Sequence, residues 1–315
     1  MKHAARRLGA AAIPFLLASC TPIPPAQPPA AVPPSPPPPV AERPASPPQA
    51  FDFALRGPLS QGGVAIGSAP AGAVSLALDG KPVELASDGR FVIGFDRDAA
   101  ATAVLTARLA DGSLLRQTLS IQPRQWRIEN LPTLPRGTTP TPEFLARRKI
   151  ELAKINAARE VRSGSMGWAQ HFLWPATGRI SGVFGSQRIY AGEPGAYHSG
   201  VDVARPAGTP VVSPADGVVI LAADAPFSLE GNLLMIDHGM GLNSAFLHLS
   251  RIDVKVGQRV TRGQLIGAVG MTGRATGPHL HWSMKWRDAR IDPQALAGPM
   301  PGAAGIQPSS ADSSD

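Results

Sequence analysis

Four side chains with metal-binding chemistry stand at short spacings in two motifs of this chain. His279 and His281 flank Leu280, and His198 stands four residues before Asp202. Residues i and i+2 of a strand point to the same face, so we expect His279 and His281 to project into one groove. Two histidines and one aspartate would give a catalytic zinc three protein ligands and leave its fourth position for water. The other histidine of the pair would then be free to move protons.

The elements that must position these residues are predicted to be strands. From residue 172 to 296 the chain has short β-runs broken by glycine, and it contains no amphipathic helical pattern of any length. We expect a compact antiparallel β domain with a groove over residues 166–297. Its strands are expected at 217–221, 233–236, 245–249, 254–258 and 264–267.

A second β region is predicted upstream, at 51–123. Alternating apolar residues at 74, 76 and 78 run into Asp79-Gly80, which is typical of a hairpin turn. Further Asp-Gly pairs at 88–89 and 111–112 favour a small antiparallel, sandwich-like domain. The region has no histidine and no tyrosine, so we interpret it as a spacer or adhesion module. The chain as a whole is therefore predicted to be all-β and mainly antiparallel.

The segment 124–165 is predicted to be a linker with one connecting helix. Thr141 suits an N-cap and Pro142 the first helical position. Residues 143–161 lack glycine and proline and are rich in strong helix formers, which predicts a helix that Ser163-Gly164-Ser165 ends.

The N-terminus has the features of an export signal. Lys2, Arg6 and Arg7 precede an apolar run that is too short to span a bilayer, and residues 1–20 end in LASC, which resembles a bacterial lipobox. Cys20, the only cysteine, is then the predicted lipidation site, although an ordinary signal with a chance cysteine is the alternative. Fourteen prolines between 21 and 50 predict a disordered tether, and a disordered tail is expected at 298–315.

The formal net charge of +7 is concentrated in the connecting segment. Residues 124–162 carry nine Lys/Arg against four Asp/Glu, whereas residues 171–297 carry eleven against nine. Such an excess suits an anionic surface such as cell wall or lipid headgroups, and it equally suits a solvated basic helix. Nucleic acid is a poorer partner, because no basic strand interleaved with aromatic residues is present.

Five motifs between residues 175 and 296 carry a family resemblance. They are GRISGVFG at 178–185, HSGVD at 198–202, PADG at 214–217, FLHLS at 246–250 and GMTGRATGPHLH at 270–281. This region, about two-fifths of the chain, resembles the lysostaphin/LytM-type zinc metallopeptidases, bacterial enzymes that cut peptide cross-links in peptidoglycan.

The resemblance implies one zinc ion per chain, with His198, Asp202 and His281 as its ligands. It makes His248 and His279 the catalytic histidines that do not bind the metal. These two rings would share the roles of base, oxyanion donor and acid, since imidazole titrates near neutral pH. Which of them is the general base stays open.

The only two tyrosines, Tyr190 and Tyr197, precede His198. A phenol there could donate to the oxyanion, and Tyr190 is the preferred candidate, with loop packing as the alternative. Phe246 stands where many relatives have tyrosine.

Several further residues have weaker candidate roles. A structural role is expected for His238, and no role for His171. Possible hydrogen-bond partners of the ligand histidines are Asp237 and Asp292, and possible groove residues are Arg274 and Thr276.

Three functions compete on this basis. The first is a zinc metalloendopeptidase that hydrolyses cross-links or stem peptides of peptidoglycan through metal-activated water. The second is a catalytically silent regulator that activates a cell-wall amidase, although relatives of that kind typically lack metal ligands. The third is an adhesin that binds the wall without cutting it.

The lipobox predicts anchoring at the periplasmic face of a membrane, and Thr21 after Cys20 favours the outer membrane.

Overall fold

The computed structural model describes residues 49–135, 137 and 140–301 of the 315-residue chain. All of these residues belong to one compact unit, Ala45–Asp315. The predicted signal peptide with Cys20, the tether up to residue 48 and the tail from residue 302 lie outside the described residues. Among the residues described, no helix combines the length and the apolar character needed to cross a membrane.

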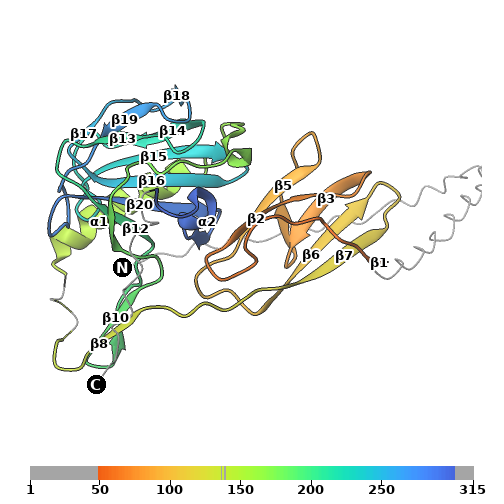
Figure 1. The fold of residues 1–315 in the computed structure, drawn as a ribbon, viewed down its shortest axis with the longest axis horizontal. Helices are drawn as coiled ribbons and strands as arrows, with labels where there is room; N and C mark the ends of the chain where they lie inside the picture. The colour runs from red at the N-terminus through yellow and green to blue at the C-terminus, as the bar shows by residue number, and fades with distance from the viewer. Residues whose placement is uncertain (1–48, 136, 138–139, 302–315) are drawn as a thin grey trace, which may run out of the picture. The chain divides into compact units, whose positions relative to one another are not determined.

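Strands dominate the first described region (Figure 1). Five of them form a sheet in the order β1-β7-β6-β3-β4, and β2 pairs with β5 in a separate sheet. The turn Asp79–Gly80 joins β3 to β4 with positive φ at both residues, which confirms the predicted hairpin. The strands are β1 (Gln49–Ala50), β2 (Val64–Ser68), β3 (Ala73–Leu78), β4 (Lys81–Val83), β5 (Arg90–Gly94), β6 (Thr102–Leu109) and β7 (Leu114–Ser120).

The connecting segment contains a strand that its sequence did not predict. β8 (Ile128–Leu131) pairs in parallel with β10 (Gln187–Tyr190), which also pairs with β11 (Glu193–Pro194). Three of the four residues of β8 are exposed, so the strand lacks the alternation by which a half-buried strand is recognised.

The predicted connecting helix is present as α1 (Pro142–Arg159). The Thr141 side chain accepts a hydrogen bond from the amide of Phe144 at 3.2 Å, and Pro142 occupies the first turn, as expected. The helix ends two residues earlier than predicted, at a C-cap formed by Glu160.

The C-terminal region is built on one large antiparallel sheet. Its order is β18-β14-β15-β16-β20-β12-β9, with β21 paired to β20, and a smaller sheet has the order β13-β19-β17. The prediction of a mainly antiparallel all-β fold is therefore confirmed. The strands are β9 (Arg179–Gly182), β12 (Gly200–Ala204), β13 (Pro210–Val212), β14 (Gly217–Ala222), β15 (Asn232–Gly239), β16 (Leu242–Leu249), β17 (Arg251–Ile252), β18 (Arg259–Val260), β19 (Leu265–Ala268), β20 (His279–Trp286) and β21 (Ala289–Ile291).

One predicted strand of this region is wrong. Residues 254–258 form a turn in which the amide of Gln258 donates to the carbonyl of Lys255 at 3.0 Å. Gly257 has φ of +83°, a conformation that favours glycine and ends an extended run. The strand β18 begins only at Arg259. Two short helical segments complete the region, the 3-10 helix η1 (Gly167–Ala169) and α2 (Gln294–Ala297).

The hydrophobic core joins both β regions. One cluster of buried side chains includes Phe53 and Leu105 from the first region and Leu280 and Trp282 from the second. A Cβ atom at Gly94 of β5 would lie 2.8 Å from the Cδ1 of Ile291, so the side chain of Ile291 packs directly on the glycine backbone. The strand β20, which carries the His-x-His motif, is therefore packed on a continuous core.

Candidate metal centre

Two neighbouring strands bring the first three candidate ligands together. In the antiparallel pair β12–β20, Asp202 lies directly opposite His281. His198 stands two residues before β12, and His279 stands two residues before His281 on β20. The register of the sheet thus brings two motifs that are distant in the sequence together in one site.

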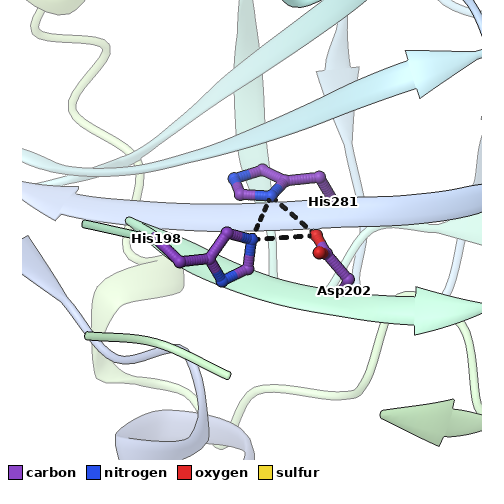
Figure 2. A group of neighbouring side chains, drawn as sticks. All are labelled: His198, Asp202 and His281. Carbon is purple, nitrogen blue, oxygen red and sulfur yellow. Dashed lines mark hydrogen bonds and ion pairs between the residues drawn. The ribbon is translucent and has the colours of Figure 1, made fainter. Parts of the chain in front are cut away.

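Three ligand atoms converge at this point (Figure 2). The Nε2 of His198 lies 3.0 Å from the Nδ1 of His281 and 3.1 Å from the Oδ1 of Asp202. The Nδ1 of His281 lies 2.8 Å from the same carboxylate oxygen. Figure 2 shows the three side chains pointing toward one another from separate parts of the backbone.

The hydrogen bonds around the cluster indicate that it is built for a cation. The other ring nitrogen of His198 lies 3.0 Å from the carbonyl oxygen of Val183 and must carry a proton to bond with it. In the neutral ring, Nε2 then presents a lone pair to His281 and Asp202. Because three electron-rich atoms face one another, a proton or a metal ion is needed between them.

The protonation equilibria of these groups are coupled. Burial opposes a charge on Asp202, but hydrogen bonds and charge interactions with His198 and His281 outweigh it and hold the pKa of the carboxyl far below its usual value. Burial also opposes a charge on His198, yet the hydrogen bond and charge of Asp202 raise the pKa of that ring. Burial lowers the pKa of His281 despite the same carboxylate. The carboxylate is therefore ionised and able to act as a ligand.

Two glycines leave the space that these ligands occupy. A Cβ atom at Gly182 would lie 2.2 Å from the Oδ2 of Asp202, and one at Gly200 would lie 2.8 Å from the Nε2 of His281.

The spacing of the three ligand atoms can be compared with that expected for zinc. Ligand atoms on tetrahedral zinc lie about 3.3 Å apart, given bonds of about 2.0–2.1 Å. The observed separations of 2.8 to 3.1 Å are within a few tenths of an ångström of that value, so the residues fit zinc.

His248 and His279 lie beside the cluster with their rings together. Their ring centroids are 4.8 Å apart, and the Nε2 of His279 lies 3.8 Å from the Oδ1 of Asp202. The Nδ1 of His248 donates to the carbonyl of Thr272, and that of His279 donates to the carbonyl of Gly277, both at 2.8 Å. A carbonyl can only accept, so both rings keep Nε2 available to take a proton.

His248 is held in an unusual backbone conformation. Its φ is +64°, which disfavours a residue with a Cβ atom by about 1–2 kcal/mol. Its amide donates to the carbonyl of Glu230 at 2.9 Å, and its ring is fixed by Thr272. Burial lowers the pKa of His248 to about 4, so the ring is neutral at pH 7. The loop that carries Glu230 therefore helps to set the position of this histidine.

The helix α1 fixes that loop, a role that its sequence did not predict. Arg148 bonds both carboxylate oxygens of Glu230 at 2.6 Å and also contacts Glu151 at 3.2 Å. Glu151 in turn accepts from the amide and hydroxyl of Ser228 at 2.7 and 2.8 Å. The connecting helix is thus linked through Glu230 to His248.

A buried arginine of the first β region contacts the loop that carries His198. Arg97 donates from Nε to the carbonyl of Gly185 at 3.0 Å, and its guanidinium stacks on the rings of Trp126 and Tyr197. The amide of Gly185 donates to the carbonyl of His198 at 2.8 Å. No local pattern signals this contact, since Arg97 and Gly185 are 88 positions apart.

The described contacts of the two tyrosines are with residues outside the ligand cluster. The hydroxyl of Tyr197 donates to Asp96 at 2.9 Å and accepts from Arg290 at 3.3 Å. Tyr190 ends β10, between β8 and β11, where its side chain interacts with that of Arg188. Among the described residues, no hydrogen bond or ring contact joins either phenol to the five histidine and aspartate side chains. The prediction of a catalytic Tyr190 gains no support from the structure.

The remaining candidates have other partners. The ring of His238 is fully buried and bonds the Asp216 carbonyl and the Ser244 hydroxyl at 2.8 and 2.9 Å, in agreement with a structural role. Asp237 accepts from Ser163, and Asp292 pairs with Arg124, so neither carboxylate bonds a ligand histidine.

The residues expected to line the groove differ in exposure. Arg274 and Thr276 are exposed, whereas Phe246 is completely buried.

Comparisons with known proteins agree with this geometry. The sequence model of peptidase family M23 matches residues 196–293, which contain all five of the clustered side chains. A crystal structure from Pseudomonas aeruginosa, described as a peptidase M23 protein, is 34% identical and covers 76% of this chain and 95% of that chain, with a TM-score of 0.60.

Two curated relatives each match about two-fifths of the chain. Peptidoglycan DD-endopeptidase ShyA of Vibrio cholerae is 43% identical over 123 residues, which are 39% of this chain. DD-carboxypeptidase/endopeptidase Mpg of Neisseria gonorrhoeae is 38% identical over 123 residues. The match spans only 28% of the length of each of these relatives.

Proposed function

Because the chain belongs to peptidase family M23, we propose that it is a zinc-dependent endopeptidase that hydrolyses peptide cross-links or stem peptides of bacterial peptidoglycan. The observation that carries this proposal is the convergence of His198, Asp202 and His281 beside two further histidines. The names of the Vibrio cholerae and Neisseria gonorrhoeae relatives support peptidoglycan as the substrate class.

The proposed metal ligands are His198, Asp202 and His281, with one zinc ion per chain. Zinc would supply Lewis-acid activation of water and polarisation of the scissile carbonyl. The single carboxylate leaves the site with a net charge of +1, which suits that role. The carbonyl of Val183 orients the ring of His198, and Gly182 leaves room for the carboxylate of Asp202.

Proton transfer falls to His248 and His279 in this proposal. Each ring donates through Nδ1 to a backbone carbonyl and keeps Nε2 available, so both can accept a proton from the attacking water or pass one to the leaving amine. His279 lies nearer to Asp202, while His248 is the more buried ring. The two imidazoles thus supply an acid and a base without a carboxylic acid.

The complete ligand set distinguishes this proposal from a catalytically silent amidase regulator. A regulator that does not cleave peptides would not require a cluster of metal ligands. It would also not require two neighbouring histidines whose Nδ1 atoms are bonded to carbonyls and whose Nε2 atoms can accept a proton. An adhesin likewise needs no such geometry. Both alternatives predict wall binding without the release of new amine termini.

The cellular setting is also part of the proposal. The lipobox at residues 17–20 supports lipidation of Cys20, and the prolines of 21–50 would let the enzyme reach from a membrane into the wall. We therefore place the protein at the periplasmic face of a bacterial membrane, with the outer membrane favoured by Thr21.

One experiment tests the enzymatic proposal. Purified protein is incubated with peptidoglycan, and the soluble fragments are identified by mass spectrometry beside His281→Ala and His171→Ala controls. We expect new peptide termini from the wild type and from His171→Ala, whose exposed ring lies outside the site, and none from His281→Ala. Equal cleavage by all three proteins after complete chelation would exclude a zinc enzyme.

A further inference from the structure

A basic cavity lies between the C-terminal end of α1 and the β20–β21 hairpin, and the proposed catalysis does not use it. It has a volume of about 570 Å³. Four cationic side chains line it, with Glu160 and Asp288 as the acidic residues of the lining. The four cations are Arg159, Arg162, Lys285 and Arg287.

The four cations of this cavity outnumber the two acidic residues of its lining. Among the described residues, none of the four cations has a carboxylate oxygen within 4.0 Å of its charged nitrogens. Lys285 also lies directly opposite Arg290 in the β20–β21 pair. Like charges at directly opposed positions of a sheet are destabilising, so this arrangement has a cost that packing alone does not explain.

One donor in the cavity lacks a partner within the described part of the chain. The Nε of Arg159 is buried and has no hydrogen-bond acceptor there. Leaving a buried donor of a charged group without an acceptor is destabilising. Burial together with the charge of Arg290 lowers the pKa of Arg159, and burial with the charges of Arg159 and Arg290 lowers that of Lys285. Burial is the main cause of both shifts, and the charges of the neighbouring cations act in the same direction.

We propose that this basic cavity binds a phosphate-bearing anion. Guanidinium groups match phosphate oxygens with paired N–H donors, and three of the four cations are arginines. A phosphate monoester carries about −1.5 to −2 charges at pH 7, which balances the excess of two positive charges in the lining. An anion at this point would also offset the charge of the Arg159 guanidinium, whose buried Nε has no acceptor among the described residues.

The phosphate could belong to a soluble compound or to the headgroup of a lipid. Both sources present non-bridging phosphate oxygens to the same donors. The distinction matters, because a lipid headgroup would hold the helix α1 and the β20 end of the catalytic sheet against a membrane surface.

Inorganic phosphate is the first probe. The full chain, the double variant Arg159→Gln/Lys285→Gln and the control Lys154→Gln are titrated with phosphate against chloride at equal ionic strength. Lys154 lies on the same helix, outside the cavity, and is exposed. At about ten times its Kd, phosphate is expected to raise the unfolding midpoint of the wild type and of Lys154→Gln by about 3–6 °C.

The double variant is expected to show no such rise. Its midpoint in chloride should equal or exceed that of the wild type, because repulsion has been removed. In ¹⁵N NMR spectra of the wild type, phosphate should shift the Nε–H resonance of Arg159. If phosphate stabilises all three proteins equally, or leaves that resonance unchanged, the site does not exist.

Vesicles then identify the source of the phosphate. Binding to vesicles of phosphatidylglycerol, but not phosphatidylcholine, that is lost in the double variant and kept in Lys154→Gln indicates a lipid headgroup. Equal vesicle binding by all three proteins, together with the phosphate-dependent stabilisation, indicates a soluble phosphate compound. Neither readout depends on peptidase activity.

Discussion

The Nε2 of His198 lies 3.0 Å from the Nδ1 of His281, although the two residues are 83 positions apart. Both atoms also face the Oδ1 of Asp202. Because the Nδ1 of His198 is protonated, its Nε2 faces the Nδ1 of His281 and the carboxylate with a lone pair, and either a proton or a metal ion must lie between the three atoms. The relationship is therefore the strongest structural reason to regard these three residues as metal ligands.

The two histidines of the His-x-His motif should respond differently to mutation. Replacement of His281 by alanine removes a ligand atom and should abolish stoichiometric zinc binding. Replacement of His279 by alanine should leave zinc bound and lower the rate of cleavage by about 10²–10⁴-fold, as expected for loss of a proton-transferring group. Elemental analysis and cleavage assays on the folded variants separate the two effects. Equal loss of zinc in both variants would show that this division of roles is incorrect.

Gly182 should be intolerant of a side chain. In Gly182→Ala the new Cβ atom would lie 2.2 Å from the Oδ2 of Asp202, so the carboxylate must move. We expect zinc affinity to fall by about 10–100-fold, the range typical of disturbed support around a metal ligand. Competition with a chelator of known affinity measures the change.

Gly277→Ala is a suitable control for that substitution, because a Cβ atom there would meet nothing within 4 Å. Its zinc affinity should equal that of the wild type. Unchanged affinity in Gly182→Ala would mean that Asp202 is not held as a ligand in the observed position.

Arg148 should affect catalysis from the helix α1. Loss of its bonds to Glu230 leaves the mostly buried carboxylate of Glu230 without its main partner and releases the loop that bonds the amide of His248. We expect Arg148→Ala to lower the free energy of unfolding by about 2–4 kcal/mol and to reduce kcat more than it raises KM. Zinc content should be unchanged, since the loop carries no ligand.

Arg147 provides the matched control for this effect. It also bonds Glu151, but 61% of its side chain is exposed, so Arg147→Ala should lower the free energy of unfolding by less than about 1 kcal/mol. If Arg147→Ala and Arg148→Ala reduce kcat equally, the contact with Glu230 does not position His248.

His238 should make the fold sensitive to acid. Burial lowers its pKa to about 4, below the value of 6.5 expected in the unfolded chain. The unfolded state therefore binds more protons between these two values, and stability that is complete above pH 6.5 is lost as the pH falls toward 4. The contribution of this shift is about 3 kcal/mol.

Chemical denaturation of zinc-free protein across this pH range measures the effect. His238→Asn keeps a donor for the carbonyl of Asp216 and has no titrating ring. It should show a smaller loss of stability between pH 6.5 and 4 than the wild type. Parallel pH profiles for the two proteins would show that His238 is not buried in its neutral form.

Local patterns were sufficient to predict several of the longer strands and the ligand motifs. Alternation with an Asp-Gly turn identifies β3, and short apolar runs broken by glycine identify β14, β15 and β16, because these signals lie within a few residues of one another. The spacing of His279 and His281 likewise reports a shared strand face. The turn at 254–258 was missed because the valines on both sides of Lys255 alternate as in a strand. The positive φ of Gly257 ends the extended conformation there.

Contacts between distant segments could not be predicted in the same way. The bonds from Arg148 to Glu230 and from Arg97 to Gly185 join residues 82 and 88 positions apart. Proximity in sequence was also misleading for Tyr197, which adjoins His198 but directs its hydroxyl to Asp96. The residues that support a site depend on packing between elements, and one sequence does not report that packing.

The most direct test of the zinc peptidase proposal compares wild-type protein with Asp202→Asn, a change that keeps the size of the ligand and removes its charge. Zinc per folded chain and new amine termini released from peptidoglycan are measured before chelation, after chelation and after zinc is restored. The proposal predicts one zinc ion per wild-type chain, activity that is lost on chelation and recovered with zinc, and neither zinc nor activity at comparable metal concentration in Asp202→Asn. Wild-type protein that releases amine termini while free of metal would contradict it.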